Sequence, residues 1–103
     1  MASPNSRDRR AIGMLGANLR DWRVLSGVTA ELMAERVGIS RTTLHAIESG
    51  STTVKLENVI AVMRVLGLIG QVVDATDPMK SDIGRARAAM LIPKAVRQRK
   101  VSS

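Results

Sequence analysis

Apolar residues recur three and four positions apart along most of the chain, a spacing that places them on one face of a helix. One such stripe predicts a helix from Ala11 to Ser26, and a second predicts a helix that starts near Leu56 and ends at Gly67. The first stripe consists of Ile12, Leu15, Leu19 and Trp22, and the second of Leu56, Val59, Ile60, Met63 and Leu66. Because Trp22 is the only aromatic residue, the core must be aliphatic and Met-containing, which suits helices better than a β-sandwich.

Between these two helices, the stretch TAELMAERVGISRTTLHAIESG predicts two short helices joined by a tight turn. Thr29 and Ser40 are expected N-cap residues, whose hydroxyls accept hydrogen bonds from the free amides that follow. Gly38 supplies the positive φ that the turn requires. The two helices are therefore expected at Ala30–Val37 and Arg41–Ser49.

The second short helix leaves polar and basic side chains on its outer face, which a helix that only supports a core does not need. Two helices in this arrangement form a helix-turn-helix, whose second helix lies in the DNA major groove. Arg suits guanine O6 and N7, Thr suits base edges or the thymine methyl group, and His suits a purine N7. The residues predicted to contact bases are Arg41, Thr42, Thr43 and His45. For His45 the alternative is an ordinary surface histidine, because the chain has no second His and no Cys for a metal site.

Phosphate contacts are expected beside the starts of the helices, where free amide groups attract anions. Lys55 stands where the helix near Leu56 would prefer a Ser or Thr cap, and a phosphate contact would explain that choice. Such contacts orient a protein on DNA without reading bases. The predicted phosphate-binding residues are Thr29, Ser40, Ser49, Ser51 and Lys55.

The segment LIGQVVDA at 68–75 is short, rich in β-branched residues and bounded by Gly67 and Asp77-Pro78, which predicts a β-strand. A single strand leaves an open edge, so a sheet shared by two copies of the chain is the economical arrangement. The predicted dimer contacts are Leu68, Ile69, Val72 and Val73. A further short helix is expected at Ser81–Leu91.

The basic residues gather at the two ends of the chain. The net charge of +7 divides into +2 for residues 1–10, +6 for residues 80–103 and −1 for the residues between them. We expect a basic flexible arm at 1–10, a DNA-binding domain with the dimerisation strand at 11–78, and a basic tail with one short helix at 79–103. Basic arms follow a phosphate backbone or dock an acidic partner, and the alternative is a pair of solvated tails.

Several function classes find no support in the sequence. The chain has no Cys, so disulfides and thiolate metal sites are excluded, and neither a metal nor a cofactor is expected. No acid–base pair, activated nucleophile or phosphate-binding loop is recognisable, so we do not expect an enzyme. Neither a signal peptide nor a membrane-spanning run is recognisable, because Arg64 and Gln71 interrupt the longest apolar stretch, and a cytoplasmic location is expected.

Residues 12–68 resemble the XRE family of phage-repressor-type helix-turn-helix domains. The matching segments are LRDWRVLSGVT, MAERVGISRTTLHAIESG and LENVIAVMRVLGL. The resemblance implies an all-α bundle of four to five helices and an internal ion pair between Arg23 and Glu48, which the residues themselves also favour over an external contact. The chain departs from the family at Ala30, where the family usually has a Gln that meets a phosphate.

The segment LGLIGQVVDATDP resembles HipB-type antitoxins, in which a strand at this point pairs between protomers, and the basic tail is similar to tails of regulators encoded beside HipA-like kinases. The resemblance implies a transcriptional repressor that binds a palindromic operator on double-stranded DNA as a homodimer. It further implies an antitoxin that binds a HipA-like kinase toxin and represses its own operon. The alternative is a stand-alone regulator of the XRE type with no toxin partner.

Overall fold

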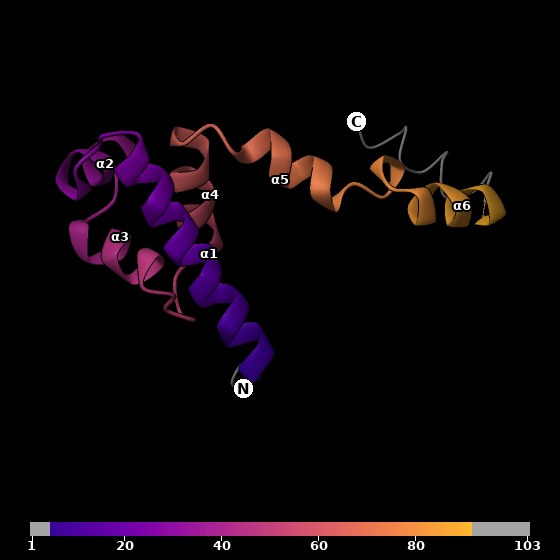
Figure 1. Ribbon diagram of the computed structural model, residues 1–103, viewed down its shortest axis with the longest axis horizontal. Coiled ribbons are helices and arrows are strands. Elements are labelled where there is room, and N and C mark those ends of the chain that lie inside the picture. The colour runs from indigo at the N-terminus through magenta and orange to yellow at the C-terminus, as the bar shows by residue number, and fades with distance from the viewer. Residues whose placement is uncertain (1–4, 92–103) are drawn as a thin grey trace. The chain divides into compact units, whose positions relative to one another are not determined.

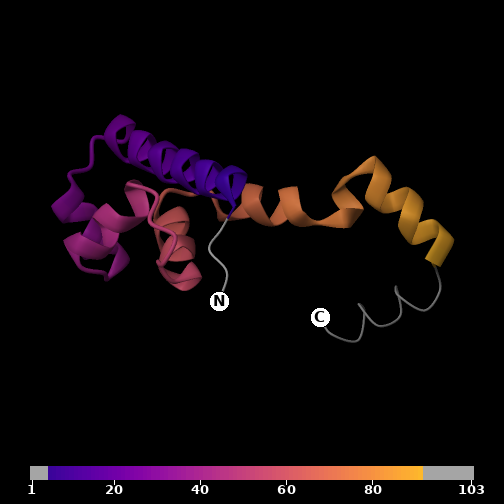
Figure 2. The same ribbon diagram turned by 90° about the horizontal axis from the view of Figure 1, so that it is seen from below.

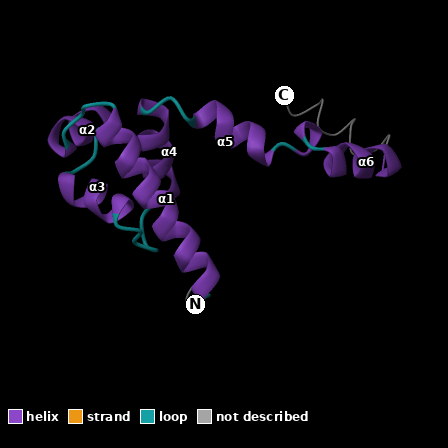
Figure 3. Ribbon diagram, in the orientation of Figure 1, coloured by secondary structure: helices purple, strands orange, loops and turns teal. Residues whose placement is uncertain are grey.

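The computed structural model describes residues 5–91, and every regular element in that range is helical (Figure 1 and Figure 3). The chain divides into two compact units, one ending at Leu68 and one beginning at Ile69. The first unit contains α1 (Ser6–Leu25), α2 (Ala30–Val37), α3 (Arg41–Glu48) and α4 (Leu56–Val65). The second contains α5 (Ile69–Thr76), the short 3-10 helix η1 (Pro78–Lys80) and α6 (Asp82–Leu91). The expected all-helical bundle is therefore confirmed for the first unit, and the described residues contain six α-helices where four to five were expected.

The four helices of the first unit share one core. Helix α1 packs against α3, and α2 contacts both α3 and α4. Figure 2 shows α1 along one side of this unit, with the three shorter helices on the other side. The buried side chains are aliphatic apart from two methionines: Leu19, Met33, Ala34, Leu44, Ile47, Val62 and Met63. Because α3 packs on both α1 and α2, these two helices fix its position in the core.

The turn between α2 and α3 confirms the prediction made from its residues. Thr29 and Ser40 each accept a hydrogen bond from the backbone N–H three residues later, at 3.1 and 3.0 Å. Gly38 has a φ of 84°, in the left-handed region that residues with a Cβ avoid. Both helices begin where expected, and α3 ends at Glu48, one residue earlier than expected.

Helix α1 begins at Ser6, so the prediction of a flexible arm at 1–10 is wrong for residues 6–10. The Asn5 side chain accepts a hydrogen bond from the backbone N–H of Asp8 at 2.8 Å, and the Asp8 carboxylate lies near the positive end of the helix. The segment SRDRR contains no apolar residue, so the spacing of apolar residues gives no signal for a helix start at Ser6. Residues 1–4 lie outside the described residues.

The buried face of α1 differs from the predicted stripe. Leu19 is buried as expected, whereas Leu15 and Trp22 are 43% and 49% exposed. The buried and half-buried face instead runs through Ile12, Gly16, Leu19 and Arg23. Gly16 and Arg23 do not count as apolar residues, so the spacing of apolar residues selected their neighbours Leu15 and Trp22 instead.

The strand predicted at 68–75 is wrong, because this segment forms most of α5. The apolar positions Ile69, Val72 and Val73 are three and four residues apart, so they fit one face of a helix, and periodicity cannot separate helix from strand in so short a run. A helix satisfies its own backbone hydrogen bonds, whereas a lone strand leaves them open. The prediction of a sheet shared between two copies depended on this strand and is therefore wrong as well.

Helix α6 lies where the sequence predicted a fifth helix, and Ser81 caps it. The Ser81 hydroxyl accepts a hydrogen bond from the backbone N–H of Gly84 at 2.9 Å. Gly84 also allows α6 to approach η1 closely, since a Cβ at this position would overlap the carbonyl oxygen of Pro78. None of the residues in α5, η1 or α6 is buried. The rest of the predicted basic tail, residues 92–103, lies outside the described residues.

Candidate nucleic-acid interface

The outer face of α3 carries three exposed side chains, Arg41, Thr42 and His45. On the opposite face Leu44 and Ile47 are only 1% and 3% exposed and hold the helix against the core. Within residues 5–91, none of the three outer side chains forms a hydrogen bond or ion pair. One short helix therefore presents a guanidinium, a hydroxyl and an imidazole to solvent.

Thr43 differs from these neighbours because its hydroxyl takes part in the cap of α3. Ser40 Oγ accepts a hydrogen bond from the Thr43 N–H and donates one to Thr43 Oγ1, both at 3.0 Å. Thr43 stands three positions after the cap, as in a capping box, but its side chain accepts from the Ser40 hydroxyl, whereas in a capping box that side chain bonds the backbone N–H of the cap residue. Thr43 is half-buried, which places it at the edge of the outer face.

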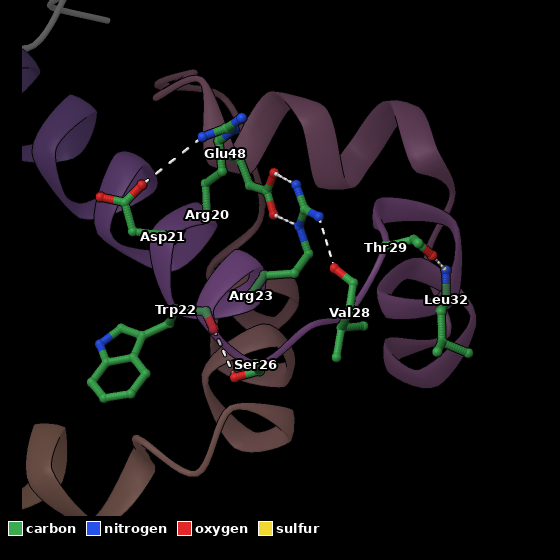
Figure 4. A network of polar contacts seen from close by, with 9 residues as sticks. All are labelled: Arg20, Asp21, Trp22, Arg23, Ser26, Val28, Thr29, Leu32 and Glu48. Atoms are coloured by element: carbon green, nitrogen blue, oxygen red, sulfur yellow. Dashed lines mark hydrogen bonds and ion pairs between the residues drawn. The ribbon is translucent and has the colours of Figure 1, made fainter.

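The predicted ion pair between Arg23 and Glu48 is present and joins α1 to the end of α3 (Figure 4). Arg23 Nε lies 2.8 Å from Glu48 Oε2, and Arg23 Nη2 lies 3.0 Å from Glu48 Oε1. Arg23 Nη1 also donates to the carbonyl oxygen of Val28 at 2.9 Å. The two side chains are 11% and 8% exposed. Because two parallel hydrogen bonds restrict both position and orientation, the pair fixes the end of α3 relative to α1.

The Arg23 member of this pair stays positively charged. The hydrogen bond to Glu48 raises the pKa of the Arg23 guanidinium above its ordinary value; partial burial opposes the shift, and the negative charge of Glu48 adds to it. An arginine with a raised pKa stays protonated throughout the physiological range. Arg23 is therefore a permanent cation of the scaffold.

Gly16 brings α1 directly against the last turn of α3. It is buried, and a Cβ at this position would overlap the carbonyl oxygen of Ile47 and lie 2.9 Å from that of Glu48. Gly13, one turn earlier, lies beside Gly50, whose own Cβ position would be 2.7 Å from the Gly13 Cα. This contact was not predicted from the sequence, and the available signal was the spacing of two glycines one turn apart inside a helix.

A concavity of about 590 Å³ lies between α1, the start of α2 and α3. It brings together residues predicted from the sequence: Arg41, Thr42, His45, Ser49 and the pair Arg23–Glu48. Ala30 also lines it, as does Arg20, which the sequence analysis did not single out. Three arginines and one glutamate give this surface a formal charge of +2 with His45 neutral, a polarity that attracts anions.

Three of the predicted phosphate-binding residues have hydroxyls engaged within the protein. Thr29 and Ser40 accept the capping hydrogen bonds of α2 and α3. The Ser49 hydroxyl donates to the carbonyl oxygen of His45 at 2.7 Å. A Ser49 contact that donates to phosphate would therefore require this internal hydrogen bond to break.

The other two predicted phosphate-binding residues, Ser51 and Lys55, do not line this concavity. The Ser51 hydroxyl lies 3.1 Å from that of Thr53, and Ser51 borders a separate apolar recess between α1, α3 and α4. Lys55 is exposed at the N-cap of α4, and its side chain makes no capping hydrogen bond. The geometry therefore leaves Lys55 as an unengaged cation beside a helix start, as its place in the sequence suggested.

The first unit and the start of the second match a known family. A family profile described as a helix-turn-helix domain matches residues 14–75, more than half of the 103-residue chain. The match includes α2, the turn and α3 in full. No curated protein matches the chain. Among residues 5–91, no helix combines the length and apolar character needed to span a bilayer.

Proposed function

The chain belongs to the family of helix-turn-helix domains. From this premise we propose that it is a transcriptional repressor that binds double-stranded DNA in a sequence-specific manner. The observation that carries the proposal is the outer face of α3, where Arg41, Thr42 and His45 are exposed and have no partner among residues 5–91. A helix is about 10–12 Å wide with its side chains, and the major groove is about 12 Å wide. This face therefore has the size and the donors needed to meet base edges.

Each of the three side chains has a distinct role in this proposal. Arg41, in the first turn of α3, donates two hydrogen bonds to guanine O6 and N7. Thr42 contacts a base edge or a thymine methyl group, and His45 donates to a purine N7. Thr43 contributes from the edge of the face, because its hydroxyl oxygen already accepts from Ser40.

Phosphate contacts orient the protein around this reading helix. The free amides at the starts of α2 and α3, beside the caps Thr29 and Ser40, attract anions. Lys55 is the predicted phosphate contact whose charged group has no internal role among the described residues. Ser49 and Ser51 rank below it in this proposal, because their hydroxyls are engaged internally.

The repressor acts as a homodimer whose two α3 helices enter successive major grooves of a palindromic operator, about 34 Å apart. Apolar side chains in the second unit support this part of the proposal. Ile69, Val72 and Val73 share one face of α5, and Val73 is 57% exposed. Burial of this apolar surface against a second copy of the chain would stabilise a dimer.

Replacing Arg41 with alanine is expected to relax discrimination at one base pair, at a cost of about 1–3 kcal/mol for the preferred base.

Replacing Lys55 with alanine should instead weaken binding to all sequences and reduce the slope of log affinity against log salt by about one. Both effects are measured by fluorescence anisotropy on a duplex taken from upstream of the protein's own coding sequence, on single-base variants of it, and at several salt concentrations.

Arg64→Ala is the matched control for Arg41→Ala, because Arg64 is also exposed but lies on α4 outside the concavity. Equal affinity of the unaltered protein for the upstream duplex and for a scrambled duplex would contradict base reading. If Arg41→Ala and Arg64→Ala lose affinity equally and keep the same base preference, Arg41 does not read a base.

Replacing Val73 with aspartate is expected to convert the dimer into a monomer in sedimentation velocity, because burial of a carboxylate without a partner is strongly unfavourable. Gln71→Asp is the control, since Gln71 lies on a different side of α5 and is also exposed. A monomeric unaltered protein would refute the dimer. A Val73→Asp variant that sediments as the unaltered dimer would move the interface away from α5.

A finer identity, the antitoxin of a HipA-like kinase, rests on the resemblance of the C-terminal segment. Exposed apolar side chains on α6 support a protein partner for this segment, since Ile83, Met90 and Leu91 are 65%, 84% and 68% exposed. The alternative remains a stand-alone regulator of the XRE type. A kinase gene adjacent to this one, with a product that co-purifies with the chain, would favour the antitoxin; absence of both would favour the stand-alone regulator.

A further inference from the structure

Two arginines one turn apart on α1, Arg20 and Arg23, both line the concavity beside α3, yet they are held very differently. Arg23 is 11% exposed and makes three hydrogen bonds, to Glu48 and Val28. Arg20 is 58% exposed, and its ion pair with Asp21 has a separation of 3.9 Å (Figure 4). Asp21 is itself 67% exposed, so this pair is weak and salt-sensitive. Arg23 is therefore committed to the scaffold, whereas Arg20 is available.

The opposite wall of the concavity belongs to α3 and carries Arg41, Thr42 and His45. Ala30, at the start of α2, contributes only a methyl group, so no long side chain from that position occupies the space. The guanidinium of Arg20 thus shares one open, positively charged surface with the residues proposed to read bases.

A helix that lies in the major groove nearly fills its width, so the two sugar-phosphate backbones pass along its flanks. The concavity is a recess along one flank of α3, and its formal charge is +2. A backbone that carries one negative charge per phosphate is complementary to such a recess. Arginine is suited to this contact, because its planar guanidinium donates to two phosphate oxygens at once.

We propose that Arg20 binds a backbone phosphate of the DNA duplex, across the concavity from Arg41, when α3 lies in the major groove. This inference rests on the proposed function and adds a phosphate contact from α1 to it. Arg20 orients the reading helix from the side, and it contributes equally to all sequences because every sequence presents the same phosphate.

Arg20→Gln is expected to weaken binding about tenfold on the upstream duplex and on a scrambled duplex of equal length. The slope of log affinity against log salt should fall by about one, and Arg20→Lys should retain most of that slope. Arg64→Gln, which removes the same charge from α4, is the matched control and should change the slope less. Anisotropy titrations at several salt concentrations give these values, and circular dichroism confirms that each variant is folded.

A second measurement identifies the phosphate itself. Duplexes with one phosphate replaced by an uncharged methylphosphonate are tested position by position. One position should weaken the unaltered protein and leave Arg20→Gln unaffected, because the variant no longer contacts that phosphate.

The outcomes separate this inference from the proposed function. If the unaltered protein binds neither duplex, the repressor proposal fails and the Arg20 contact fails with it. If it binds DNA but Arg20→Gln and Arg64→Gln behave alike, the Arg20 contact is refuted while DNA binding stands. If Arg20→Gln weakens only the upstream duplex, Arg20 contacts a base, and the phosphate assignment is refuted.

Discussion

Replacing Glu48 with alanine is expected to lower the free energy of unfolding by about 3 kcal/mol. In the unaltered protein the Arg23 side chain is 11% exposed, and the substitution removes the carboxylate that accepts two of its hydrogen bonds. A buried charge that loses its partner is destabilising by far more than the net value of the intact pair. Urea denaturation followed by circular dichroism measures the difference.

Glu35→Ala and Arg20→Ala serve as controls, because these residues are exposed charges on α2 and α1. Both variants should unfold near the midpoint of the unaltered protein. The double variant at Arg23 and Glu48 should lose less stability than the two single variants together, since each single change removes the same interaction. A Glu48→Ala variant as stable as Glu35→Ala would contradict the bracing role of the pair.

The stability difference between the unaltered protein and Glu48→Ala is also expected to respond to pH in a defined way above neutrality. Because the pKa of Arg23 is raised by folding, its contribution is complete below the unfolded pKa and is lost only as the pH rises through the folded pKa. Both values lie above the physiological range. The stability difference between the unaltered protein and Glu48→Ala should therefore stay constant between about pH 7 and pH 10.

Replacing Gly16 with alanine is expected to destabilise the protein by about 2 kcal/mol, although alanine favours helices. The added methyl group would overlap the carbonyl oxygen of Ile47 and lie 2.9 Å from that of Glu48. Backbone atoms cannot rotate away as a flexible side chain can, so α1 and α3 must separate. The separation also shifts the Arg23–Glu48 pair, and DNA affinity should fall together with stability. Thermal unfolding and anisotropy titrations test the two effects.

Gly13→Ala is the matched control for Gly16→Ala. Gly13 lies in the same helix one turn earlier, and a Cβ built there meets no atom within 4 Å. The substitution should stabilise the protein by about 0.5–1 kcal/mol through the helix preference of alanine. If both variants are stabilised alike, the close approach of α1 and α3 at Gly16 carries no energetic consequence.

The region from Thr29 to Glu48 could be predicted from the sequence because its determinants are local. A cap hydroxyl acts on an amide three residues away, and Gly38 sets its own φ. The exposed face of α3 followed from the same register. The ion pair of Arg23 and Glu48 joins residues 25 positions apart. It was expected because two opposite charges fell on helices that had to pack together, and because the family resemblance implied the same pair.

Other features could not be predicted because they depend on contacts between distant segments. The spacing of apolar residues predicted that Leu15 and Trp22 lie on the buried face of α1, whereas the observed face includes a glycine and an arginine in their place. Arg20 has no motif that marks it, and its place beside α3 appears only when α1 and α3 pack. The segment of α5 fits either a helix or a strand in its apolar spacing, and β-branched composition favoured the wrong one.

The supports of α3 are unevenly distributed along its eight residues, about 12 Å of helix. Gly16 and Arg23 hold its trailing end, whereas its leading end is secured by the Ser40 cap and the packing of Leu44. Because the contacts of Gly16 and Arg23 both act on the last turn of α3, any tilt of the helix about that end would displace its first turn most. Arg41 has the longest side chain among Arg41, Thr42 and His45, and it lies in the first turn. A long side chain can still meet a base when the backbone position there varies slightly. The shorter imidazole of His45 stands one turn nearer Glu48, where less reach is required.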